Sequence, residues 1–366
     1  VSKKNNPQLF FSGRREICYG EETTITVSGA GADDKNYSWY VNDIDEATPG
    51  RSKAFKVGGD YAGTYHVIGR NNYGCETDSA ITIKVNALPE LTINGVNNGS
   101  TAICEGQDAT LKATDDANYQ YSWSTNSSAN SINVTPSIST TYNLRVTDKT
   151  TNCSNNDTYT VNVHKLPTVT LSSDPMICAG KDLKVEATPT DATAAPDSYS
   201  WNGETASTVG TYLVNQYNTV GDGQDITLTT QKTYNITQDT KLTCEAKTST
   251  KVSVKSNPTI EVKVDQDYCN DEKIILNIVK ENTSATKFIW ADGLQETSNE
   301  KYEVTNVQIG NNQFKIVGVK EYVENNTSKK CYDTTKVTTK VYALPTIDIE
   351  GPAFVCKETT TQLSAK

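Results

Sequence analysis

The chain has 366 residues, with 44 acidic and 34 basic side chains and a formal net charge of −10. An acidic chain repels phosphate backbones, which argues against nucleic acid as a partner. No apolar run reaches the roughly 18 residues that a membrane-spanning helix needs, so we expect no membrane span.

A repeat is marked by prolines, usually after a small or apolar residue. These prolines are Pro7, Pro89, Pro167, Pro258 and Pro345. Their spacings of 78 to 91 residues suit a small all-β domain rather than one coil of a solenoid. The predicted domains are residues 1–88, 89–166, 167–257 and 258–344, followed by the start of a fifth at 345–366. Because the sequence starts without a signal peptide and stops inside a repeat, we expect a longer polypeptide around it.

The first repeat alternates apolar and polar residues in short runs. Ile25 and Val27 alternate in this way near its beginning, and Ile81 and Ile83 do so near its end. A period of two residues predicts half-buried antiparallel strands, and the Asn- and Gly-rich segment 71–74 predicts a turn between two of them. No segment has the pattern of an amphipathic helix.

The later repeats keep this frame. In the second repeat Leu111 and Ala113 follow Cys104 by seven and nine residues, and Val185 and Ala187 follow Cys178 in the same way. The third repeat carries an additional stretch at residues 205–225. Variable loops on a common scaffold are frequent binding sites, so this stretch is a candidate ligand loop, although an inert insertion fits as well.

Each complete repeat has one Trp two residues after an aromatic residue, and a second aromatic residue at the predicted start of a later strand. The Trp residues are Trp39, Trp123, Trp201 and Trp290, and the second set is Tyr65, Tyr142, Tyr234 and Phe314. This pattern resembles immunoglobulin-like (Ig-like) domains, in which such residues form the core of a β-sandwich. A Trp face also suits a sugar ring, but the fixed place in the frame favours the core. We therefore predict an all-β chain of tandem Ig-like sandwiches arranged end to end as a rod.

Nine cysteines recur at corresponding places, two in each complete repeat and one in the truncated repeat. The first cysteines of the repeats are Cys18, Cys104, Cys178, Cys269 and Cys356, and the second cysteines are Cys75, Cys153, Cys244 and Cys331. No C-x-x-C motif is present, so regular thiols at these places indicate disulfides and an oxidising, extracytoplasmic compartment.

The pairing follows from the ends of the sandwich at which the cysteines lie. In the Ig-like topology the first cysteine lies at the C-terminal end of its domain and the second at the N-terminal end. Ten strand residues separate Tyr65 from Cys75, roughly 33 Å, whereas a disulfide needs Cα atoms about 4.4 to 6.8 Å apart. We therefore predict bonds between consecutive domains. The predicted pairs are Cys18 with Cys153, Cys104 with Cys244, and Cys178 with Cys331, leaving Cys75, Cys269 and Cys356 free or paired outside this sequence. Pairing within a domain, such as Cys18 with Cys75, is the alternative.

No catalytic site is predicted. The two histidines, His66 and His164, lie in different repeats, and no nucleophile is organised with a base. We also predict no metal site and no cofactor. Ser79 and Thr334 follow aspartates in short matches to a bacterial O-glycosylation motif, so they are candidate modification sites.

The combined frame, from the Ile-Cys-x-Gly start through Tyr-x-Trp and Thr-Tyr-x-Leu to the closing Leu-Pro, resembles the Ig-like and PKD-like repeats of giant surface adhesins of Bacteroidota. This resemblance implies a stalk segment exported by type IX secretion, attached to the outer membrane through other regions, and used in adhesion and gliding motility. The implied partners are neighbouring repeats, a surface glycan or protein, and the secretion and motility machinery. The alternatives are a ligand-binding Ig-like array and spacer repeats of a large secreted enzyme.

Overall fold

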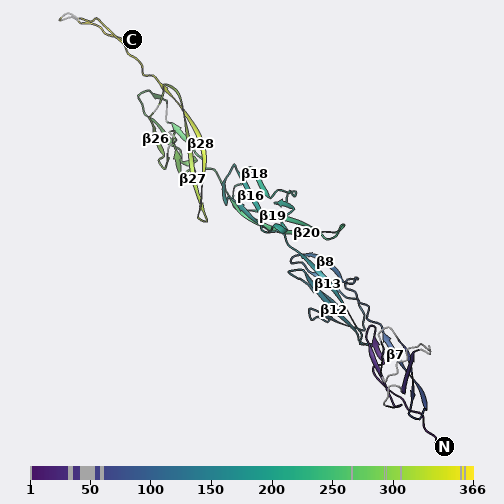
Figure 1. Ribbon diagram of the computed structural model, residues 1–366. Helices are drawn as coiled ribbons and strands as arrows, with labels where there is room; N and C mark the ends of the chain where they lie inside the picture. Colours follow the sequence, from purple (N-terminus) through teal and green to yellow (C-terminus); the bar gives the residue numbers. More distant parts are fainter. Residues whose placement is uncertain are drawn as a thin grey trace. The chain divides into compact units, whose positions relative to one another are not determined.

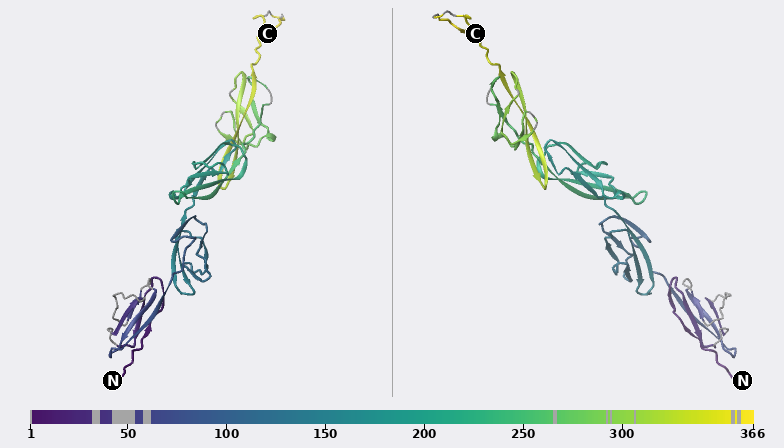
Figure 2. Two further views of the ribbon diagram at one scale, coloured as in Figure 1. Left: turned by 90° about the vertical axis from the view of Figure 1, so that its right-hand side faces the viewer. Right: turned by 60° about the vertical axis from the view of Figure 1, so that its left-hand side comes forward.

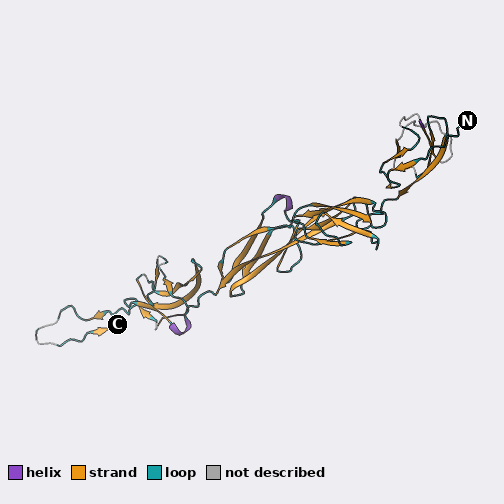
Figure 3. Ribbon diagram, turned by 90° about the horizontal axis from the view of Figure 1, so that it is seen from below, coloured by secondary structure: helices purple, strands orange, loops and turns teal. Residues whose placement is uncertain are grey.

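The computed structural model of the chain describes residues 2–31, 36–41, 54–57, 62–264, 267–291, 293, 295–305, 307–354, 357 and 360–366. By contacts the chain separates into two units, one comprising Val1–Leu166 and Thr233–Cys244, the other Pro167–Lys232 and Glu245–Lys366. Strands form most of the regular structure in the described residues (Figures 1 and 3). The 3-10 turns in the described residues include Ala192–Ala194 and Lys280–Asn282.

The first sandwich consists of two sheets. One has the order β1-β3-β5 and the other β2-β7-β6-β4. Their strands are β1 (Phe10–Ser12), β2 (Glu16–Cys18), β3 (Thr23–Ser28), β4 (Tyr37–Val41), β5 (Ala54–Val57), β6 (Gly63–Arg70) and β7 (Glu76–Asn86). Ile25, Val27 and Ile83 lie in the cluster that the two sheets enclose, as their alternation with polar residues predicts.

The second sandwich repeats this plan within the same unit. A four-stranded sheet of order β10-β12-β13-β8 faces the pair β11-β9. Its strands are β8 (Gly99–Cys104), β9 (Ala109–Lys112), β10 (Tyr119–Trp123), β11 (Ser131–Val134), β12 (Thr140–Asp148) and β13 (Ser154–His164). Trp123 and Leu144 are directly opposite each other on β10 and β12, and both are buried in the core.

The third sandwich has sheets of order β14-β16-β18 and β15-β20-β19-β17. Its strands are β14 (Val169–Ser173), β15 (Met176–Cys178), β16 (Lys181–Pro189), β17 (Ser198–Trp201), β18 (Thr211–Tyr217), β19 (Gly221–Asn235) and β20 (Lys241–Lys255). The end of the long β19–β20 hairpin, Thr233–Cys244, belongs to the first unit, while the core of this sandwich lies in the second.

The fourth sandwich has sheets of order β21-β23-β26 and β22-β28-β27-β24-β25. Its strands are β21 (Val262–Val264), β22 (Tyr268–Cys269), β23 (Ile274–Ile278), β24 (Lys287–Ile289), β25 (Glu296–Thr297), β26 (Lys301–Val304), β27 (Gly310–Glu324) and β28 (Thr327–Tyr342). After it, β29 (Ile349–Glu350) pairs with β30 (Ser364–Ala365). Figure 2 shows the strands from two further sides.

One parallel strand pair recurs in all four sandwiches and places the first cysteine. In each sandwich the strand that ends at the first cysteine pairs in parallel with the last long strand, whereas the other described strand pairs are antiparallel. This pair sets Cys18 opposite Asn86, Cys104 opposite His164, Cys178 opposite Lys255, and Cys269 opposite Tyr342. The first cysteine therefore lies beside the last residues of its own sandwich, where the chain leaves for the next one.

The prolines that mark the repeat are bound in the same way in three sandwiches. The Thr77 hydroxyl donates to the carbonyl of Pro7 at 2.7 Å, the Asn155 amide to Pro89 at 3.0 Å, and the Thr230 hydroxyl to Pro167 at 2.6 Å. Because these three prolines are fixed to the sandwiches that follow them, we keep the predicted boundaries 1–88, 89–166, 167–257 and 258–344 as proposed domain limits, with 345–366 as the start of a fifth repeat.

Two expectations for the third repeat are wrong. Tyr234 was predicted to start a strand in the core, but it lies near the end of β19 and is only partly buried, outside the core cluster. Trp201 is opposite Leu228 as Trp123 is opposite Leu144, so Ile226, 2% exposed, takes the place of Tyr142. The stretch 205–225 is also not a long loop, because it contains β18, which pairs with β16 along the sheet.

Candidate functional site: disulfides between successive sandwiches

Three disulfides join cysteines of consecutive sandwiches. Their Cα–Cα distances are 5.5 Å for Cys18–Cys153, 5.6 Å for Cys104–Cys244 and 5.6 Å for Cys178–Cys331, all within the usual range. These are the pairs that the strand arrangement predicts, and the pairing of Cys18 with Cys75 is not formed. Each bond joins a first cysteine to the second cysteine of the next sandwich.

Five of the six bonded cysteines are buried, and Cys18 is partly exposed. Cys153, Cys244 and Cys331 have no exposed surface, and Cys104 and Cys178 are also buried. Cleavage of a disulfide requires attack by a thiolate on one sulfur, so burial slows reduction. Among the described cysteines, Cys75 and Cys269 are free and partly buried, and Cys356 lies outside the described residues.

The hairpin end Thr233–Cys244, which belongs to the first unit, makes an aromatic contact with the end of β13 beside the disulfide Cys104–Cys244. The ring of Tyr234, on the β19–β20 hairpin, lies 4.5 Å from the ring of His164 between centroids. The Tyr234 hydroxyl donates to the carbonyl of Lys165 at 2.9 Å. Tyr234, which the sequence placed in the core, is therefore a junction residue. Its ring contacts the last residue of β13, and its hydroxyl binds the linker.

The third and fourth sandwiches meet through ion pairs. Lys255, at the end of β20, lies 2.5 Å from a carboxylate oxygen of Asp222 and 2.9 Å from one of Glu324, and its side chain is only 12% exposed. Glu324 ends β27 at the tip of the β27–β28 hairpin. Lys329, on the same hairpin, pairs with Asp174 at 3.1 Å. These contacts hold the hairpin of the fourth sandwich against the third.

Hydrogen bonds to Asp222 and Glu324 raise the pKa of the Lys255 ammonium group above its usual value, against a smaller opposing effect of burial. Hydrogen bonds from Lys255 and then Ser253 lower the pKa of the Glu324 carboxyl. Both groups are therefore charged over a wide pH range around neutrality.

The ion pair should weaken in acid. The contacts at this junction lower the pKa of the Glu324 carboxyl. The stabilisation of the junction by Glu324 is therefore present above the usual glutamate pKa of about 4.3, and it is lost as the pH falls through the lowered pKa. The contribution of Lys255 is lost only in strong alkali, because its pKa is raised. A carbon-13 NMR titration of the Glu324 carboxyl should give a midpoint below that value, and Lys255→Met should move it upward. Identical midpoints in the two proteins would refute the coupling.

The four Trp residues lie in the sandwich cores, each no more than 5% exposed. Trp201 stacks on Tyr212 and Trp290 on Tyr302, with centroids 5.5 and 5.4 Å apart. Tyr65, Tyr142 and Phe314 are buried in the clusters of their sandwiches. In this state no Trp indole offers a face to a sugar.

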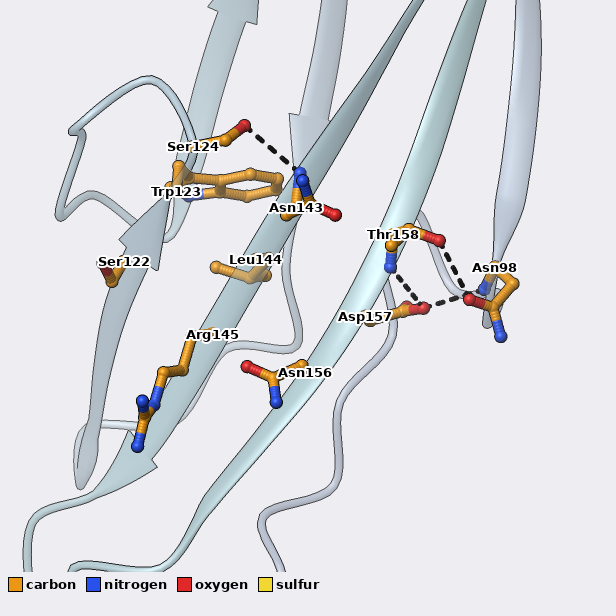
Figure 4. A pocket seen from close by; sticks show the side chains of 10 residues that line it. All are labelled: Asn98, Ser122, Trp123, Ser124, Asn143, Leu144, Arg145, Asn156, Asp157 and Thr158. Carbon is orange, nitrogen blue, oxygen red and sulfur yellow. Dashed lines mark hydrogen bonds between the residues drawn. The ribbon is translucent and has the colours of Figure 1, made fainter.

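A shallow hollow of about 460 Å³ lies on the β10-β12-β13-β8 sheet (Figure 4). Its lining is largely amides and hydroxyls, with Arg145 at one side. The Asp157 carboxylate accepts the N–H groups of Asn98 at 2.9 Å and Thr158 at 2.8 Å. Asp157 therefore fixes the turn that leads into β8, which is a structural role.

The candidate modification sites lie on the last long strands of their sandwiches. Ser79 is partly exposed on β7, and Thr334 is exposed on β28. Their modification stays a prediction. No helical segment in the described part of the chain is long and apolar enough to cross a bilayer.

Sequence reasoning missed His164 and Lys255 at the junctions. His164 and Lys255 each stand three residues before a marker proline, Pro167 and Pro258. This common offset was the available signal, because the parallel strand pair places that residue opposite the first cysteine.

No family model and no curated protein matches the sequence. Among solved structures, three domains of the outer capsid protein Hoc of bacteriophage RB49 are 15% identical, and the match covers 68% of this chain and 99% of that chain with a TM-score of 0.30. The ICAM-5 D1–D4 fragment is 7% identical, with coverages of 91% and 100% and a TM-score of 0.33. The titin fragment I67–I69 is 12% identical, with coverages of 69% and 100% and a TM-score of 0.32. We therefore assign the fold from the strand order of the sheets and not from these similarities.

The chain is a tandem array of Ig-like β-sandwiches in which disulfides join consecutive sandwiches. Disulfides of this kind are typical of proteins that work in oxidising compartments outside the cytoplasm.

Proposed function

We propose that the chain is a repeat segment of a very large secreted cell-surface adhesin, whose disulfide-linked sandwiches transmit force along the molecule. The observation that supports this proposal is the direction of the three bonds, each from one sandwich to the next. A disulfide within a domain protects only that domain, whereas a bond between domains also limits how far they can be pulled apart.

The arrangement suits a load-bearing stalk in a second respect. In the fourth sandwich β27 pairs along its whole length with the last long strand, β28, from Gly310 opposite Val341 to Glu324 opposite Thr327. A pull along such strands loads many hydrogen bonds at once. The stalk is proposed to be stiff, to be non-catalytic, and to use neighbouring repeats as its direct partners.

The biological role follows the resemblance to giant adhesins of Bacteroidota. It comprises export by type IX secretion, outer-membrane attachment through other regions, a surface glycan or protein as ligand, and surface adhesion with gliding motility. Such associations depend on likeness between repeats rather than on a site in this chain.

The proposal is tested on cells that make the full-length protein. Antibodies raised against this chain should label intact cells, and replacing Cys178 and Cys331 by Ser should weaken attachment under flow while leaving labelling unchanged. Labelling only after permeabilisation, or unchanged attachment of the labelled variant, would overturn the proposal.

A further inference from the structure

A tyrosine recurs on the hairpins that carry the second cysteines. Tyr322 lies two residues beyond Lys320, which is directly opposite Cys331 on β27 and β28. Tyr234 occupies a similar place on the β19–β20 hairpin, next to Thr233, whose hydroxyl meets that of Thr243 at 3.2 Å beside Cys244. Each tyrosine therefore projects from its hairpin just beyond the disulfide.

The two tyrosines bind equivalent groups of the preceding sandwich. Tyr234 donates to the carbonyl of Lys165 and Tyr322 to that of Ser256, both at 2.9 Å. Each acceptor stands two residues before a marker proline. The Tyr234 ring lies on His164, and the Lys255 ammonium lies 5.8 Å from the Tyr322 ring centroid.

The same groups meet in the first sandwich. The Lys4 ammonium lies 4.6 Å from the ring centroid of Tyr73, and Tyr73 is close to Cys75 in the turn between β6 and β7. Lys4 stands three residues before Pro7, as His164 does before Pro167. A tyrosine beside the second cysteine thus contacts the residue three before the proline in three of the four sandwiches.

The junction of the first and second sandwiches is built differently. The N–H of Asp148 donates to the carbonyl of Cys153, so Asp148 is the residue opposite the second cysteine. The position two residues further on, which holds the tyrosine in the other hairpins, is Thr150 here. This hairpin end is held within itself, because the Asp148 carboxylate accepts the N–H groups of Thr150 at 2.7 Å and Thr151 at 3.0 Å. Cys18–Cys153 therefore serves as an internal reference without a tyrosine.

We propose that Tyr234 and Tyr322 are positioning residues that select the partners of Cys244 and Cys331. This inference rests on the proposed function, since it concerns the same bonds between sandwiches. In the reduced chain, the hydrogen bond from the tyrosine to the linker carbonyl docks the hairpin beside the first cysteine of the preceding sandwich. Docking raises the effective concentration of the correct thiol over that of the other cysteines.

The oxidant for this step is a glutathione disulfide. A protein thiolate attacks it, forms a mixed disulfide and releases one glutathione thiolate. The second cysteine then displaces the other glutathione and forms the bond between sandwiches. Two protein thiols are oxidised and one glutathione disulfide is reduced to two thiols, so electrons and protons balance.

The test is equilibration of the whole chain in glutathione redox buffers, followed by alkylation and mass spectrometry of each cysteine pair. Tyr234→Phe should shift the equilibrium of Cys104–Cys244 about five-fold toward the reduced form, which is the effect expected for one net hydrogen bond. Tyr322→Phe should shift Cys178–Cys331 alone by a similar factor. Cys18–Cys153 should stay unchanged in both variants.

Tyr332→Phe is the matched control, because Tyr332 is exposed and adjacent to Cys331 on β28. It should leave all three equilibria unchanged. The role of the tyrosines would be overturned if all three equilibria in the Phe variants equalled those of the unmodified chain. A parallel shift of all three equilibria would overturn it as well. If the bonds between sandwiches do not form in the unmodified chain, the proposed function fails instead, so the two failures are distinguishable.

Discussion

Pulled by its two termini, the oxidised chain should extend to a contour of only about 80 residues, roughly 280 Å, however far the sandwiches unfold. The covalent path runs from residue 1 to Cys18, crosses to Cys153, follows the chain to Cys178, crosses to Cys331 and continues to residue 366. Residues 19–152 and 179–330 lie in loops closed by these two bonds and carry no load. After reduction the contour should reach about 1,300 Å.

The three bonds differ in this experiment, which supplies matched controls. The bond Cys104–Cys244 offers only a detour between residues 153 and 178, because that route runs back to Cys104 and returns from Cys244. The direct segment 153–178 is shorter and bears the load, so replacing both Cys104 and Cys244 by Ser should leave the limit of about 80 residues unchanged. Replacing Cys18 and Cys153 should lengthen the limit to about 200 residues. Single-molecule force spectroscopy measures these contours directly. Equal extensions of the oxidised and reduced chains would show that the bonds do not carry the load.

Trp123→Ala should lower the free energy of unfolding of the second sandwich by about 3 to 5 kcal/mol. Trp123 is 2% exposed, is opposite Leu144, and donates its indole N–H to the carbonyl of Ala129 at 2.8 Å. Truncation opens a cavity and leaves that carbonyl without its donor. Because domains are stable by only about 5 to 15 kcal/mol, much of the stability would be lost.

Hydrogen exchange followed by mass spectrometry measures this effect sandwich by sandwich. Peptides of the second sandwich should exchange faster in Trp123→Ala, while those of the fourth should not change. Ser122→Ala is the control on the same strand, because Ser122 faces outward and should alter the stability by less than about 0.5 kcal/mol. A Trp123→Ala protein with unchanged exchange would contradict the assigned core.

The sequence predicted the features that depend on local pattern. Alternation at Ile25 and Val27 indicated a strand with one buried face, and the structure has β3 there. The fixed place of Trp39 and Trp123 after an aromatic residue indicated the core. The direction of the disulfides followed from strand length, because the ends of a strand cannot meet.

The prediction failed where one local pattern fits two places. Thr233 and Tyr234 match the Thr-Tyr pair that opens a core strand in the second repeat. The position that is actually buried holds Ile226, which is not aromatic and so does not match that pair. Since β19 is 15 residues long, both sites lie on the same strand, and only pairing with Trp201 decides which one is buried. The ion pair of Lys255 with Glu324 could not be predicted from the sequence either. Glu324 is far from Lys255 along the chain, and only the folding of the β27–β28 hairpin brings the two side chains together.

The most direct measurement is disulfide mapping of the unreduced protein by proteolysis and mass spectrometry. We expect linked peptides joining Cys18 with Cys153, Cys104 with Cys244, and Cys178 with Cys331. Peptides joining Cys18 with Cys75 or Cys104 with Cys153 would contradict it, because each sandwich would then be closed on itself and no bond would pass a load to the next.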